Sequence, residues 1–291
     1  MGAPTLTIII PAYNEETSLQ KFLPEVIAFC KQKSHKIIVV NDGSKDDTKK
    51  VLESFSGESS LTILTNKLNA GYGAAIKKGV RHADTDFVVT VDADGQHDLA
   101  DVEKLFLKAI ETDADMVIGN RGNSSGYYRT FGKWLIRKIA GMLMTLPVHD
   151  INSGMKLYRT YLAKKYITIC PETMAYSDII LLAFVFKRNL VLEMPITIKP
   201  RTSGTSTINA MTAVDTIKEI MNIVVLFNPI RIFFPAGILI ILASLLWNIH
   251  IFMRGGGVSS GTLLGILMGI IFFLFGLIAH QLSAFRRETL E

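Results

Sequence analysis

The chain has 291 residues, of which 49% are hydrophobic, and a formal net charge of +5. This length gives room for a sizeable folded domain and a smaller part beside it. Cys30 and Cys170 are too few for a disulfide framework, so we expect both to be reduced and inert. The basic residues concentrate toward the C-terminal end, and attraction to anionic lipid head groups explains this placement most simply. We therefore do not expect a nucleic-acid partner.

Short runs rich in Val, Ile and Thr alternate with helix-length segments over the first two hundred residues. This alternation predicts an α/β fold with parallel strands joined by helical crossovers. The first run lacks the basic leader and cleavage site of a signal peptide, so we expect it to be a strand. The predicted strands cover residues 5–10, 36–40, 61–64, 86–91 and 115–119.

Polar loops follow the first four predicted strands. Ligands of such sheets gather at the carboxyl ends of the strands, so we expect the four loops to converge on one edge. After the second strand, Asp42 could accept hydrogen bonds from a nucleobase or ribose, and Gly43 permits the close turn this requires. Taken alone, these residues are better explained as a plain turn followed by a helix cap. The loops are 11–16, 41–44, 66–73 and the segment that begins at Asp92.

The fourth strand runs into the sequence DADGQH, which contains Asp92 and Asp94. Residues two apart on a strand point the same way, so both carboxylates can bind one divalent cation. Mg²⁺ or Mn²⁺ prefers oxygen ligands and completes its shell with substrate phosphates. The spacing therefore predicts a diphosphate site, although a solvated turn would have the same pattern.

The sequence GYGAA at residues 71–75 differs from the dinucleotide-binding fingerprint. Ile76 replaces its third small residue, and the segment follows the third strand instead of the first. A nicotinamide cofactor is therefore not expected. We expect residues 69–73 to open a helix beside a nucleotide.

Two C-terminal stretches, 232–252 and 255–285, contain no Asp, Glu, Lys or Arg. Each is long enough to cross a bilayer core of about 30 Å as a helix. The Gly-rich connection is short, so the helices should form a hairpin. Segments 129–146 and 207–228 could lie in the membrane interface, although an ordinary helix covering the sheet explains the first equally well.

The distribution of Lys and Arg around the two spans predicts their orientation. The connection between the spans carries only Arg254, and the basic residues gather outside the hairpin. The positive-inside rule then places the large domain and both termini in the cytosol. A lone hairpin buries little of its own surface, which leaves room for association of several copies. The predicted division is 1–206 for the large cytosolic domain, 207–229 for a juxtamembrane helix, 230–253 and 262–285 for the spans, 254–261 for the external loop and 286–291 for a cytosolic tail.

Six motifs appear in the same order and spacing as in a known family. They are PAYNEE at 11–16, NDGS at 41–44, N-x-GYG at 69–73, DADGQH at 92–97, GNR at 119–121 and DINSGMKLYR at 150–159. The chain resembles family 2 glycosyltransferases of the GT-A fold, and among them the polyisoprenyl-phosphate glycosyltransferases. That group includes the dolichol-phosphate mannose and glucose synthases and bacterial undecaprenyl-phosphate glucosyltransferases. The resemblance covers about residues 5–207, and the two spans are similar to a bacterial subgroup with a transmembrane hairpin.

The resemblance implies roles for individual residues. Thr207 stands where the family usually has Lys, which puts one phosphate contact in doubt. Asp150 matches a carboxylate discussed as catalytic, or it caps a loop, and Asp178 is either an acid of the site or a structural carboxylate. The implied roles are nucleotide binding for Pro11, Tyr13, Glu15, Asp42, Asn69, Gly71, Asp92 and Arg201, metal binding for Asp92, Asp94 and Gln96, acceptor-phosphate binding for Arg121 and Arg129, and catalysis for Asp94, Asp150 and Arg121.

The implied reaction moves one hexose, with inversion, from a nucleotide diphosphate sugar to a polyprenyl phosphate. The second pKa of a phosphate monoester is about 6, so the phosphate oxygen of the acceptor is largely ionised at neutral pH and needs no general base. We therefore expect an orienting or electrostatic role for Asp150. Two alternatives are a processive polysaccharide synthase, disfavoured because no Q-x-x-R-W segment is present, and a non-catalytic nucleotide-sugar-binding membrane protein.

Overall fold

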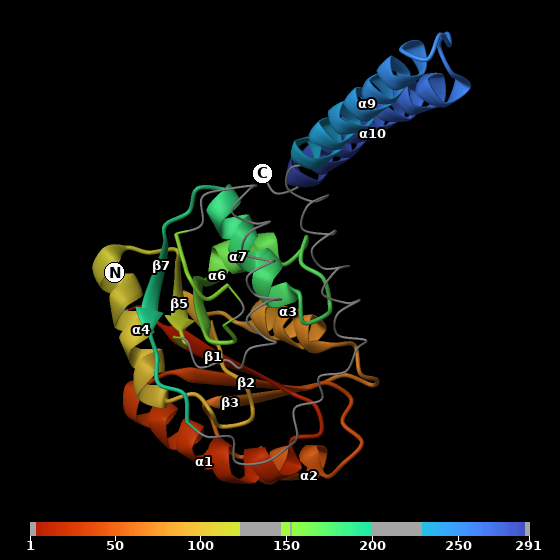
Figure 1. Ribbon diagram of the computed structural model, residues 1–291. Coiled ribbons are helices and arrows are strands. Elements are labelled where there is room, and N and C mark those ends of the chain that lie inside the picture. The colour runs from red at the N-terminus through yellow and green to blue at the C-terminus, as the bar shows by residue number, and fades with distance from the viewer. Residues whose placement is uncertain (1–3, 123–146, 152, 200–228, 289–291) are drawn as a thin grey trace. The chain divides into compact units, whose positions relative to one another are not determined.

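One mixed β-sheet organises the N-terminal part of the chain in the computed structural model, which describes residues 4–122, 147–151, 153–199 and 229–288 (Figure 1). The strand order in the sheet is β3-β2-β1-β4-β6-β5-β7. The C-terminal helices belong to a second unit, which we describe separately. The strands are β1 (Leu6–Ala12), β2 (Lys36–Asn41), β3 (Leu61–Thr65), β4 (Phe87–Thr90), β5 (Met116–Asn120), β6 (Lys156–Arg159) and β7 (Val191–Pro195).

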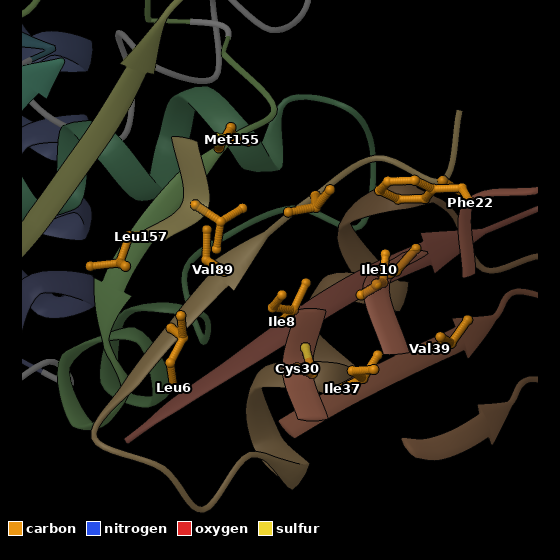
Figure 2. Packing of buried hydrophobic residues seen from close by; sticks show 14 of the residues in the cluster. Leu6, Ile8, Ile10, Phe22, Cys30, Ile37, Val39, Val89, Met155 and Leu157 are labelled. Atoms are coloured by element: carbon orange, nitrogen blue, oxygen red, sulfur yellow. The ribbon is translucent and has the colours of Figure 1, made fainter. Parts of the chain in front are cut away.

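Helices cover both faces of the sheet, which is why β1 reads as a continuous apolar run. Ile8 and Ile10 point into a core built with α1, α2 and α4, and Figure 2 shows them beside Phe22 and Cys30 of α1. Ile9 points to the other face, where α3 approaches so closely that a Cβ on Gly79 would lie 2.5 Å from its Cγ2 atom. The helices are α1 (Glu16–Lys33), α2 (Thr48–Ser54), α3 (Tyr72–His82), α4 (Leu99–Thr112), α6 (Thr160–Tyr166) and α7 (Tyr176–Phe186).

The predicted α/β fold is confirmed, but the expectation of parallel strands is only partly correct. β1 pairs in parallel with β2 and β4, and β2 with β3. β6 then pairs antiparallel with both β4 and β5. The pattern did not predict β6 because its sequence, KLYR, begins and ends with basic residues, and Lys156 is nevertheless fully buried.

The second unit contains two long apolar helices, α9 (Ile230–Phe252) and α10 (Ser260–Glu288). Both are long and apolar enough to cross a membrane. Only 6% of the apolar window of α9 and 17% of that of α10 are buried, whereas the core helix of a soluble domain is mostly buried. The C-terminal hairpin expected from the sequence is therefore present.

Small residues let the two helices of the hairpin approach each other. A Cβ on Gly237 would lie 2.8 Å from the carbonyl oxygen of Gly269, and one on Gly265 would overlap the side chain of Ser244. Large residues instead face outward, with Leu246 67% exposed. This arrangement is typical of membrane helix pairs, where close backbone contact replaces hydrophobic burial.

A polar cluster closes the hairpin. The Asn248 side-chain oxygen accepts hydrogen bonds from the Ser259 amide at 3.1 Å and from the Thr262 hydroxyl at 3.0 Å. The Ser259 hydroxyl also accepts from the Thr262 amide at 3.1 Å, which caps the first turn of α10. This cap begins α10 at Ser260, two residues before the predicted boundary. The two proposed interfacial segments, 129–146 and 207–228, lie outside the described residues.

Candidate active site

A pocket of about 360 Å³ lies at the carboxyl ends of β1, β2 and β4. This is the edge at which polar loops were expected to converge. Seven predicted site residues line it, whereas Gly71, Gln96, Arg121 and Asp150 do not, and Arg129, Arg201 and Thr207 lie outside the described residues. The lining consists of Pro11, Ala12, Tyr13, Glu15, Asp42, Asn69, Tyr72, Ala75, Asp92, Ala93, Asp94 and Met174.

Hydrogen bonds join the loops after β1 and β2. The Asn14 amide donates to the Ser44 hydroxyl at 3.0 Å, and the Lys45 amide donates back to the Asn14 side-chain oxygen at 2.8 Å. The Glu15 amide donates to the Thr48 hydroxyl at 2.9 Å. These contacts fix the segment that carries Tyr13 and Glu15 into the pocket wall.

Asp42 holds the loop after β3 against the pocket. Its carboxylate accepts hydrogen bonds from the Asn66 side chain at 2.6 Å, the Ala70 amide at 3.0 Å and the Gly71 amide at 2.8 Å. Gly43 allows this approach, because a Cβ there would lie 2.5 Å from the carbonyl carbon of Leu68. A carboxylate has about four acceptor sites, so Asp42 builds the wall and keeps capacity for one donor of a ligand.

The start of α3 is fastened to the loop before α7. Gly71 has φ +103° and touches the carbonyl oxygen of Glu172, which also accepts a hydrogen bond from the Ala74 amide at 3.2 Å. The Ala74 amide, in the first turn of α3, therefore bonds to a protein acceptor. Gly71 serves this close approach and does not line the pocket, although Asn69 and Tyr72 on either side of it do.

Asp92 and Asp94 both line the pocket just beyond β4. Asp92 Oδ1 accepts a hydrogen bond from the Tyr72 hydroxyl at 3.1 Å, and Asp94 Oδ1 accepts one from the Gln96 amide at 3.1 Å. Burial and the charge of Asp92 hold the pKa of Tyr72 well above its usual value, so this phenol stays protonated and donates. Gly95, with φ +71°, turns the chain between them and Gln96.

The two carboxylates suit a hard divalent cation. The described residues contain no group of three or more His, Cys, Asp or Glu side chains able to hold a metal ion. A pair of carboxylates in one open pocket instead matches Mg²⁺ or Mn²⁺, which keep water and substrate phosphates as their remaining ligands. Gln96 lies outside the pocket lining, and its carbonyl oxygen accepts from the Lys199 amide at 2.8 Å.

Arg121 and Asp150, predicted from separate motifs, form a bidentate ion pair. Arg121 Nε donates to Asp150 Oδ2 at 2.7 Å and Nη2 donates to Oδ1 at 2.9 Å. The Asp150 amide donates to Glu193 Oε1 at 2.7 Å, which links the pair to β7. The hydrogen bond and charge of Asp150 raise the pKa of Arg121. The pair fixes the orientation of the Arg121 guanidinium, a group whose planar donors match the geometry of a phosphate.

Two further buried ionisable residues, Lys156 and Asp178, influence each other's pKa and were not predicted as a unit. Lys156 is fully buried on β6, and its ammonium donates to the Ile151 carbonyl at 2.8 Å, to the Ser177 carbonyl at 2.6 Å and to the Ser177 hydroxyl. Burial lowers the pKa of Lys156 to about 8, with Asp178 opposing the shift. Burial raises the pKa of Asp178 to about 6, with Lys156 opposing. Among the described residues, Asp178 Oδ1 has no hydrogen-bond partner.

Sequence reasoning missed two pocket residues with large side chains, Tyr72 and Met174. Tyr72 lies inside the GYG motif, which the sequence analysis interpreted only through its two glycines. Met174 belongs to the loop before α7, which had no recognisable pattern. It is 65% exposed, which is unusual for a large apolar side chain and places it at the pocket opening.

Two family models match the chain. That of glycosyl transferase family 2 matches residues 7–167, and that of the GtrB C-terminal hairpin matches residues 228–285. A solved structure of similar fold is glucosyl-3-phosphoglycerate synthase from Mycobacterium tuberculosis in complex with Mn²⁺, UDP and phosphoglyceric acid. It matches with a TM-score of 0.57 and 18% identity over 76% of this chain and 78% of that one.

Curated relatives act on polyprenyl phosphates according to their names. Dolichyl-phosphate beta-glucosyltransferase ALG5A of Trichomonas vaginalis is 34% identical over 53% of this chain, and the match spans about half, 52%, of that relative. Undecaprenyl-phosphate 4-deoxy-4-formamido-L-arabinose transferase of Sodalis glossinidius is 27% identical over 95% of this chain and 85% of the relative. With a family model covering more than half of its length, and the GT-A fold and the paired carboxylates in place, the chain belongs to glycosyl transferase family 2.

Proposed function

We propose that this protein transfers a single hexose from a nucleotide diphosphate sugar, of the UDP-glucose or GDP-mannose class, to a polyprenyl phosphate. The observation that carries the proposal is the placement of Asp92 and Asp94 in the same pocket as Asp42, Tyr13 and the first-strand loop. Asp92 and Asp94 would offer two carboxylates to a metal and diphosphate, and Asp42 would offer a carboxylate acceptor to a nucleoside.

The relatives support the nature of both substrates. Two of them are named for dolichyl phosphate or undecaprenyl phosphate as acceptor. The Mycobacterium tuberculosis structure of the same fold contains Mn²⁺ and UDP, and a second one contains Mg²⁺ and UDP. The polyprenyl chain of the acceptor would stay in the bilayer that the hairpin crosses, with its phosphate at the membrane surface.

When bound, Mg²⁺ or Mn²⁺ would neutralise negative charge that develops on the departing diphosphate. Asp92, Asp94 and, from the resemblance, Gln96 would hold the ion. Asp94 would contribute to catalysis only by holding this ion. Pro11, Tyr13, Glu15, Asp42 and Asn69 would hold the nucleoside, Gly71 would keep the wall in place, and Arg201 would close over the nucleotide.

The acceptor phosphate would meet Arg121 and Arg129, which offset the repulsion between two anionic substrates. Asp150 is committed to Arg121 through both of its carboxylate oxygens, which supports an orienting role for it instead of proton abstraction. An ionised phosphate needs no such base. Its oxygen would attack the anomeric carbon from the face opposite the diphosphate, so the anomeric configuration inverts.

The proposal includes an orientation in the membrane. The large domain and both termini face the cytosol, because Lys and Arg gather outside the hairpin while its connection carries only Arg254. The predicted boundaries, with a domain at 1–206, a juxtamembrane segment at 207–229 and a tail at 286–291, belong to the same proposal. The outward faces of the hairpin are apolar, and lipid or a second copy of the chain would cover them.

The test uses membranes that contain the full-length protein, a panel of radiolabelled nucleotide sugars and polyprenyl phosphate. We expect labelled lipid carrying one sugar from one donor, loss of product with EDTA, and recovery with Mg²⁺ or Mn²⁺. Asp94→Asn should lower the rate about 100-fold or more, since a metal ligand supplies several kcal/mol. Asp98→Asn is the matched control, because Asp98 caps α4 and does not line the pocket.

Each alternative outcome has a distinct meaning. A labelled polymer would indicate a processive synthase. Binding of a nucleotide sugar without turnover would indicate a sensor or anchor. If no donor yields labelled lipid while control synthases do, the proposed function is wrong.

A further inference from the structure

The carboxylate of Asp92 is held from two sides by groups that belong to different loops. The Tyr72 hydroxyl, on the first residue of α3, donates to Oδ1 at 3.1 Å. On the other side, the Cα of Gly154 lies so close that an added Cβ would be 2.5 Å from Oδ2 and 3.2 Å from Cγ. Tyr72 donates a hydrogen bond to the carboxylate, and Gly154, which has no Cβ, leaves room for it.

Both neighbours are themselves fixed. The Gly71 amide donates to Asp42 at 2.8 Å, which anchors the residue before Tyr72. The Gly154 carbonyl accepts a hydrogen bond from the Thr90 hydroxyl at 2.6 Å, and Thr90 is the last residue of β4. Asp92 therefore sits between two rigid supports, and its orientation depends on both.

We infer that Tyr72 and Gly154 are positioning residues that preset the Asp92 carboxylate for a divalent cation. This inference rests on the proposed function, because it assumes that Asp92 binds the ion. Hydrogen bonds to metal-binding carboxylates typically change metal affinity by about 10- to 100-fold. Neither residue needs to touch the ion or the sugar.

Two substitutions disturb Asp92 by independent routes. Tyr72→Phe removes only the hydroxyl and keeps the ring in the pocket wall. Gly154→Ala adds a methyl group that meets the carboxylate end of the Asp92 side chain and not its backbone, so the carboxylate must turn while the backbone keeps its path. We expect each variant to weaken Mn²⁺ binding about 10-fold or more.

The chain offers a matched control for each variant. Tyr176→Phe also removes a buried hydroxyl, one that has no hydrogen-bond partner among the described residues. Gly57→Ala adds a methyl group where nothing lies within 4 Å. Both controls should bind Mn²⁺ as the unmodified protein does.

The experiment titrates Mn²⁺ into full-length protein in detergent with UDP or GDP present, and follows free Mn²⁺ by electron paramagnetic resonance. Thermal unfolding of each variant checks that it is folded. Weaker binding in Tyr72→Phe and Gly154→Ala, with unchanged controls, supports the inference. Unchanged binding in folded Tyr72→Phe and Gly154→Ala overturns it while leaving the proposed function intact. Absence of Mn²⁺ binding by the unmodified protein with either nucleotide would count against the proposed metal site itself, and this inference would fall with it.

Discussion

The sheet domain and the hairpin use large apolar side chains in opposite ways. Ile8 and Val89 of the sheet are completely buried, whereas Leu246 and Trp247 of α9 are 67% and 62% exposed. In the sheet domain, burial of such residues drives folding. In the hairpin they face outward, and glycines make the contact between helices. The same residue types therefore report stability in one unit and membrane residence in the other.

The largest expected effect contrasts two leucines. Leu23 of α1 is fully buried, so Leu23→Ala should lower the free energy of unfolding by about 2–5 kcal/mol. Leu246→Ala makes the same chemical change on an exposed face and should change it by less than about 0.5 kcal/mol. Denaturant unfolding of the full-length protein in detergent measures both. Similar losses for the two variants would contradict the contrast.

The next effect concerns a glycine of the hairpin, where a large apolar side chain should be disruptive, unlike in the sheet domain. Gly265→Leu should separate α9 from α10, because even a Cβ there overlaps Ser244, and should cost about 1–3 kcal/mol of packing. The distance between spin labels on the two helices should increase. Gly257→Leu, in the connection where no atom lies within 4 Å, should leave that distance unchanged. An unchanged distance in Gly265→Leu would show that the helices do not meet at this residue.

The sheet domain also buries an ionisable side chain, that of Asp178, and its stability should therefore depend on pH. The pKa of Asp178 rises from 3.8 to about 6 on folding, because burial disfavours the ionised form. Between these values the folded state binds a proton that the unfolded state lacks, so the free energy of unfolding should fall as pH rises from about 4 to about 6.

Asp178→Asn should remove this contribution, which amounts to about 1–2 kcal/mol. Denaturant unfolding at several pH values between 4 and 6 gives the slope. Glu111→Gln, at an exposed carboxylate of α4, should keep the slope of the unmodified protein. A slope that survives in Asp178→Asn would assign the effect to another group.

The smallest effect concerns the polar cluster at the turn of the hairpin. Asn248→Ala removes an acceptor used by the Ser259 amide and the Thr262 hydroxyl, and should cost about 0.5–1.5 kcal/mol. The Ser259 amide should exchange its hydrogen faster. Leu245→Ala, one turn away on an exposed position, should leave this exchange rate unchanged. Equal exchange in both variants would show that the cluster does not hold the turn.

Local patterns predicted the first five strands and the hairpin, because each depends on the periodicity or length of an apolar run. The carboxylates Asp42, Asp92 and Asp94 also stood out as polar residues at strand ends, whereas the family resemblance pointed to Pro11, Tyr13 and Glu15. They did not predict β6, since the burial of Lys156 depends on acceptors from Ile151 and Ser177 that only the fold brings together. They also did not predict the ion pair between Arg121 and Asp150, because these residues are far apart in the sequence and only the fold brings them together. The role of Tyr72 became visible only when α3 was placed against Asp92.

The contact between the start of α3 and the loop before α7 has a consequence for sequence variation. Gly71 and Gly73 meet backbone oxygens of Pro171, Glu172 and Thr173, not their side chains. In a saturation library, the 172 position should therefore accept many residue types, while positions 71 and 73 accept almost none. Substitution of Met174 would then change the shape of the pocket, while the backbone contact between the start of α3 and the loop before α7 stays the same.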